Sequence, residues 1–91
     1  MQVTCIKKRG DHYDKHRRIS AIGGSGFNIL RWTMNEEDAI RSIEEGRETF
    51  YVSVNGRTVN VIVAIHEGRK YLKTTADGYS PDNLLSLPEC S

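Results

Sequence analysis

The chain has 91 residues, of which 37% are hydrophobic and 27% are charged. This length fits one domain with one core, and the apolar content is too high for a disordered chain. The longest apolar stretch, residues 59–65, is far too short to cross a bilayer, so we expect a cytoplasmic protein without a membrane partner. Cys5 and Cys90 do not indicate a disulfide framework, and we expect two reduced thiols, although one bridge between the chain ends stays open.

The net charge of +1 is unevenly placed along the chain. Residues 1–32 carry seven Lys or Arg against two Asp, whereas the remaining residues carry six against ten acidic residues. A basic N-terminal third is the first indication of an anionic partner.

Two short strands are expected in this N-terminal third. Alternation around Val3 and Cys5 predicts the first strand, and the apolar residues of 19–22 predict the second, which ends at Gly23. Residues 7–17 between them are rich in charge and poor in apolar side chains, which predicts a solvated, mobile connection. Residues 23–26, Gly-Gly-Ser-Gly, are interpreted as a loop.

A helix is predicted over residues 35–45. Residues 33–36 form a capping-box pattern, and Ala39, Ile40 and Ile43 follow at helical spacing before Gly46. A short helix with a narrow apolar stripe needs another surface, so we expect it to pack on a sheet.

Two hairpins are predicted after the helix. A turn at Asn55-Gly56 places Val52 opposite Val59, and a turn at Glu67-Gly68 places Leu72 opposite Val63. Tyr71 then points to the other face. The expected fold is α+β: an antiparallel sheet with a three-strand C-terminal meander and one or two N-terminal strands, and one helix packed on one face. The expected core face comprises Phe50, Val52, Val59, Val61, Val63, Ile65 and Leu72.

The C-terminal residues carry a longer pattern. A turn at Asp77-Gly78 and a helical turn starting at Ser80-Pro81 precede Leu84, Leu85 and Leu87, which we expect to fold back on the domain.

Residues 71–74 (Tyr-Leu-Lys-Thr), 76–78 (Ala-Asp-Gly) and 81–88 (Pro-Asp-Asn-Leu-Leu-Ser-Leu-Pro) resemble domain-of-unknown-function family 3892. The resemblance covers a core of residues 18–88 within a single domain of residues 1–91. It implies a small bacterial or archaeal protein, and it carries over no activity, cofactor or catalytic residue.

The basic N-terminal segment is the first candidate binding region. Its cations could each displace a counterion from a phosphate backbone, and a tyrosine among them could stack on a base. The alternative is an ordinary solvated loop. The candidate nucleic-acid-binding residues are Lys7, Lys8, Arg9, Tyr13, Lys15, Arg17 and Arg18.

A polar cluster near the C-terminal turn is the second candidate. Its carboxylates and amide could converge on a small ligand, which would suit a ligand-binding protein or a minor enzyme. The alternative is turn chemistry, in which such side chains bond nearby backbone amides. The candidate residues are Lys73, Thr74, Asp77, Asp82 and Asn83.

Neither a metal site nor a cofactor is predicted. The possible donors Cys5, His12, His16, His66 and Cys90 lack closely paired thiols, and the Gly23–Gly26 stretch lacks the lysine of a phosphate-binding loop. No catalytic motif is found, so an enzyme is the less favoured interpretation. The leading interpretation is a small binding or interaction module, with nucleic acid or a protein as the possible partner.

Overall fold

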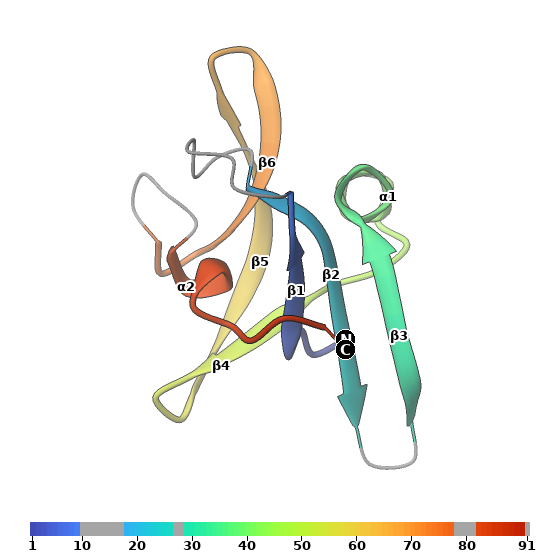
Figure 1. Ribbon diagram of the computed structural model, residues 1–91. Helices are drawn as coiled ribbons and strands as arrows, with labels where there is room; N and C mark the ends of the chain where they lie inside the picture. Colours follow the sequence, from blue (N-terminus) through green and yellow to red (C-terminus); the bar gives the residue numbers. More distant parts are fainter. Residues whose placement is uncertain (10–17, 27–28, 78–81, 91) are drawn as a thin grey trace.

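The computed structural model describes residues 1–9, 18–26, 29–77 and 82–90. Its described residues form two three-stranded antiparallel sheets and two helices (Figure 1). The N-terminal sheet has the order β1-β2-β3, the C-terminal sheet has the order β4-β5-β6, and α1 follows β3 directly. The α+β class is confirmed. The elements are β1 (Cys5–Lys8), β2 (Ile19–Gly26), β3 (Ile29–Asn35), α1 (Glu36–Glu44), β4 (Tyr51–Val54), β5 (Arg57–His66), β6 (Arg69–Thr74) and α2 (Asp82–Leu85).

The two predicted hairpins are confirmed in register. Val52 pairs with Val59 in β4–β5, and Val63 pairs with Leu72 in β5–β6. Both turns place two successive residues at positive φ, with Asn55 at 50° before Gly56 at 79°. This conformation suits the twist of the flanking strands and explains why an Asn-Gly pair stands there.

The N-cap of α1 lies two residues later than the capping-box pattern suggests. The N-cap is Asn35, whose side chain accepts a hydrogen bond of 2.8 Å from the backbone N–H of Asp38. Thr33 instead lies within β3, a strand that the sequence interpretation missed. Ala39 and Ile40 are buried, as their helical spacing predicts.

The N-terminal region differs from the expectation of a single sheet extended by short strands. Lys7 and Lys8 belong to β1 rather than to a mobile connection, and β2 continues through the glycine-rich stretch that was interpreted as a loop. Residues 10–17, the rest of the predicted mobile segment, lie outside the described residues. β1, β2 and β3 therefore form a second sheet of their own, distinct from the C-terminal meander.

Close packing explains the glycines in β2. A Cβ atom on Gly23 would lie 2.8 Å from both Cys90 Sγ and the backbone oxygen of Trp32, and one on Gly24 would collide with the backbone oxygen of Gln2. Any larger residue would push these neighbours away.

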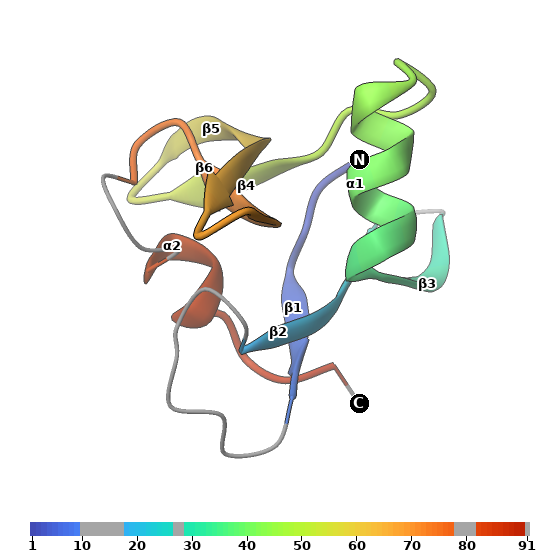
Figure 2. The same cartoon turned by 90° about the horizontal axis from the view of Figure 1, so that it is seen from above.

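The first residues of the chain join the two sheets. Val3 donates a backbone hydrogen bond of 2.8 Å to Tyr51, whereas Thr4 donates one of 2.9 Å to Gly23 in β2. Figure 2 shows this segment running between α1 and the C-terminal sheet before it enters β1.

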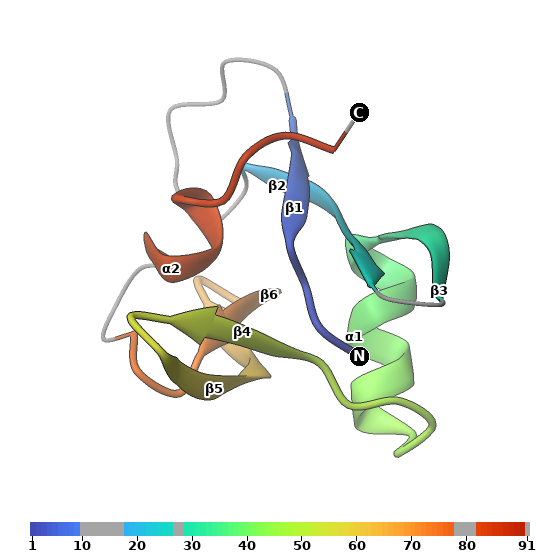
Figure 3. The same ribbon diagram turned by 90° about the horizontal axis from the view of Figure 1, so that it is seen from below.

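The C-terminal tail lies along β1. The N–H of Ile6 donates to Pro88, and the N–H of Cys90 donates to Ile6 over 2.9 Å. Figure 3 shows the tail crossing β1. This contact brings the Cα atoms of Cys5 and Cys90 to 4.9 Å, and their sulfurs form a disulfide. The expectation of two reduced thiols is therefore wrong in this structure, because the tail pairs with β1.

The core fills the space enclosed by both sheets and both helices. Ile6, Ile22, Leu72 and Leu84 are fully buried, which confirms that the tail folds back on the domain. Tyr71, expected on the outer face, is also buried. Ile65, expected on the core face, is 68% exposed because the β5–β6 hairpin projects beyond the rest of the domain (Figure 1).

Candidate functional site

The predicted basic residues that the structure describes gather at one end of the N-terminal sheet. Lys7 and Lys8 are the last two residues of β1, and the backbone N–H of Arg9 bonds the carbonyl oxygen of Arg18 just before β2. The other predicted residues of this set, Tyr13, Lys15 and Arg17, lie outside the described residues.

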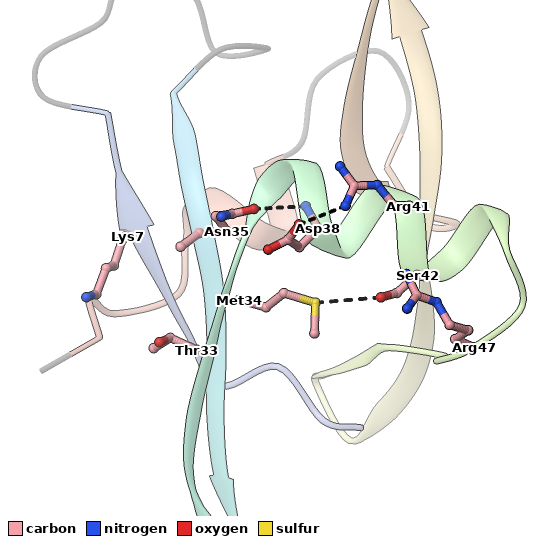
Figure 4. A pocket seen from close by; sticks show the side chains of 9 residues that line it. Lys7, Thr33, Met34, Asn35, Asp38, Arg41, Ser42 and Arg47 are labelled. Atoms are coloured by element: carbon pink, nitrogen blue, oxygen red, sulfur yellow. Dashed lines mark hydrogen bonds and ion pairs between the residues drawn. The ribbon is translucent and has the colours of Figure 1, made fainter.

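A groove of about 650 Å³ lies beside these residues and extends across β3 to α1. Figure 4 shows Lys7 and Thr33 on one side of β3, and Arg41 and Arg47 on the other. We call this surface the basic groove, because its described lining residues include three cations and one carboxylate. The charged lining residues are Lys7, Asp38, Arg41 and Arg47.

Strand register places Lys7 in the basic groove. Successive side chains of a strand point to opposite faces, and Ile6 is fully buried in the core, so Lys7 faces outward. Lys7 pairs with Ala21, which in turn pairs with Asn35, so these three residues form one row across the sheet. The small side chain of Ala21 leaves the floor of the groove open.

Arg41 of α1 and Arg47, which follows the helix, supply the other two cations. Arg41 Nη1 lies 3.3 Å from Asp38 Oδ1, and Arg47 Nε lies 2.9 Å from Glu45 Oε1. All four side chains are more than half exposed, and exposed ion pairs of this kind contribute only about 0–1 kcal/mol. Both guanidinium groups can therefore turn to an anionic ligand at small cost. Neither arginine could be predicted from the sequence, since only the β3–α1 connection brings them beside β1.

A buried carboxylate ties the basic region to the β5–β6 hairpin. Glu36, at the start of α1, lies 2.7 Å from Arg69 Nη2 and 3.6 Å from Arg9 Nη2, and its side chain is 3% exposed. Burial raises the pKa of Glu36, and the two arginines offset this only in part. Arg9 is thus engaged within the protein, which leaves it less suited to hold an external phosphate.

The polar cluster near the C-terminal turn is brought together, but its groups bond one another. Asp77 accepts hydrogen bonds from the N–H of Thr74 at 2.9 Å, from Thr74 Oγ1 at 3.0 Å and from the N–H of Asn83 at 3.1 Å. Asn83 Nδ2 in turn donates to Thr74 Oγ1. Lys73 is half-buried, but it precedes Thr74 in β6, so its side chain points to the opposite face of the strand. The side chain of Asp82 lies outside the described part of the chain. This arrangement fixes the chain path into α2, as turn chemistry does.

The remaining candidate ligands do not converge in the described residues, where no three His, Cys, Asp or Glu side chains form a possible metal site. Cys5 and Cys90 are joined to each other, and His66 faces Glu67 at 3.9 Å. His12 and His16 lie in residues 10–17, outside the described residues. Within the described ranges, neither α1 nor α2 has the length and apolar character needed to cross a membrane.

The fold and the site define a small α+β domain with two antiparallel sheets and a basic groove at the junction of the N-terminal sheet and α1. The chain belongs to the family described as protein of unknown function (DUF3892), whose model matches residues 2–88. Comparison with curated proteins and with solved structures finds no match. The family match starts at residue 2, so it includes β1 and the basic residues that lay outside the resemblance noted from the sequence.

Proposed function

We propose that this domain is a small binding module that holds the phosphate backbone of a nucleic acid in the basic groove. The observation that carries the proposal is the meeting of Lys7 from β1 with Arg41 and Arg47 from the helix region around one open floor. Lys7 is exposed, and among the described residues no ion pair joins it to a carboxylate. Guanidinium and ammonium groups are the usual donors to phosphate oxygens.

Phosphate contacts of this kind confer affinity but no direct sequence information. A stacking platform is also lacking on the C-terminal sheet, because Tyr71 is buried and Tyr51 is half-buried. The net charge of only +1 limits long-range attraction. We therefore expect binding in about the micromolar range that is independent of sequence and falls steeply with salt.

The small-ligand and enzyme alternatives have less support. They rely on the cluster of Thr74, Asp77 and Asn83, whose hydrogen-bonding groups are used within the turn. A ligand there would have to replace those bonds.

The test is a titration of labelled single- and double-stranded DNA and RNA by fluorescence anisotropy at several salt concentrations. Lys7→Ala, Arg41→Ala and Arg47→Ala should each weaken binding and reduce the salt slope by about 0.7 to 0.9. Arg57→Ala is the matched control, because Arg57 is an exposed cation at the start of β5, outside the basic groove. Absence of binding at low salt, or equal losses for Arg57→Ala, would contradict the proposal.

A further inference from the structure

The two sides of β5 have different neighbours. Asn60 accepts a backbone hydrogen bond of 2.9 Å from Thr75 on the β6 side, whereas Val61 donates one of 2.9 Å to Phe50 on the β4 side. Backbone groups of successive strand residues alternate between the two edges. Even-numbered residues of β5 beyond Asn60 therefore bond β6, and odd-numbered residues point to the β4 side.

The β4 side of β5 is open beyond Val61. β4 starts at Tyr51, and the chain before it leads back to α1, so β4 does not continue alongside the second half of β5. Val63 and Ile65 consequently point their N–H and C=O groups outward, and no other residue in the described ranges bonds them. We call this stretch the open β5 edge.

The open β5 edge lacks the features that usually protect a free strand. Residues 61–65 read Val-Ile-Val-Ala-Ile, without a charge or a proline, and Ile65 is 68% exposed. Natural sheets normally blunt such an edge with lysine, proline or a bulge, because unpaired backbone groups are a template for another strand. The hairpin that carries this edge also projects beyond the N-terminal sheet (Figure 1).

We propose that a second copy of this chain pairs with the open β5 edge, so that two copies form one continuous antiparallel sheet. With a two-fold axis at Ala64, Val63 of one copy faces Ile65 of the other, and both outward-pointing residues of each chain find partners. Ala64 then faces its own counterpart, where its small side chain leaves room. Residues 61–65 are uncharged, so no like charges meet along the paired stretch itself.

A second cavity supports this register. A groove of about 340 Å³ lies where β4 leaves β5, with Ile43, Phe50 and Val61 in its lining. In the proposed register, the Glu67-Gly68 turn of the second copy comes opposite Val61 and enters this groove. An unrelated extended peptide would gain only the short edge, whereas a second copy also fills the groove. The occupant that the edge fits is therefore this chain itself.

Sedimentation velocity from about 1 μM to 1 mM, without nucleic acid, tests the proposal independently of the basic groove. We expect a concentration-dependent dimer that Ile65→Lys weakens at least about tenfold, because a lysine blocks edge pairing. Thr58→Lys is the matched control: Thr58 is also exposed on β5, but it pairs with Ser53 and lies away from the open edge. A monomer throughout this range, or equal effects of both variants, would overturn the proposal.

Amide hydrogen exchange on the unmodified chain tests the register without a variant. At high protein concentration, the amides of Val63 and Ile65 should become protected, while those of Ile62 and Ala64, already bonded to β6, should change little. Unchanged exchange at Val63 and Ile65 in a dimer would place the interface elsewhere and refute the register.

Discussion

Reducing the Cys5–Cys90 disulfide should remove a large part of the stability of this domain. The bridge joins residues separated by 85 positions, and closing a loop of that length in the unfolded chain is worth about 4 to 5 kcal/mol by chain entropy. A domain of 91 residues has a total stability of about 5 to 14 kcal/mol. The reduced protein should therefore remain folded only narrowly, or unfold at moderate temperature.

Urea unfolding followed by Trp32 fluorescence, with and without a phosphine reductant, measures this loss. Cys90→Ser is the control: it should match the reduced wild type and should not respond to the reductant. A loss below about 1 kcal/mol would refute the reasoning, because the hydrogen bonds between the tail and Ile6 would then hold the ends together unaided. The result also bears on the predicted cytoplasmic location, since disulfides persist mainly in oxidising compartments.

Three further predictions concern single side chains. Gly23→Ala should destabilise the fold by about 1 to 3 kcal/mol in urea unfolding, because its Cβ would meet Cys90 Sγ at 2.8 Å. The folded-state pKa of Glu36 is raised above its ordinary 4.5, so its contribution to stability is full below pH 4.5 and is lost as pH rises through the folded-state pKa. The free energy of unfolding should therefore fall between pH 4 and 7 in the wild type, and Glu36→Gln should abolish that fall. An unchanged pH profile in the variant would count against this assignment. Leu72→Ala, at a fully buried site, should cost about 2 to 5 kcal/mol, whereas Ile65→Ala should change the stability of the dilute protein by about 0.5 kcal/mol at most.

Local patterns were sufficient to predict the C-terminal half of the fold. The Asn55-Gly56 turn and the Glu67-Gly68 turn each set a register, and alternation of apolar residues then fixed which strand positions face each other. Burial of Leu84 also followed from its need for an apolar surface.

Contacts between distant segments explain what the sequence did not reveal. Gly23 and Gly24 have the composition of a loop, but they lie within β2. Glycine is required there because Cys90 and Gln2 leave no room for a Cβ atom. No local signal indicates that the tail would return to β1, so the disulfide was only the less favoured of the two states considered for Cys5 and Cys90.

The candidate site also depends on contacts between segments that are distant in the sequence. Lys7 was identified from charge density alone, whereas Arg41 and Arg47 join it only through the packing of α1 beside the N-terminal sheet.

The position of β1 constrains the order in which this chain can fold. Its neighbours are β2 on one side and residues 88–90 on the other, and the residues just before it pair with β4. Both edges of β1 are therefore filled only when β2 and residues 88–90 are in place. The meander of β4, β5 and β6 has only local pairings and should form first, because short loops close at a lower entropic cost. β1 should then be captured late, because one of its partners, residues 88–90, is distant in the sequence.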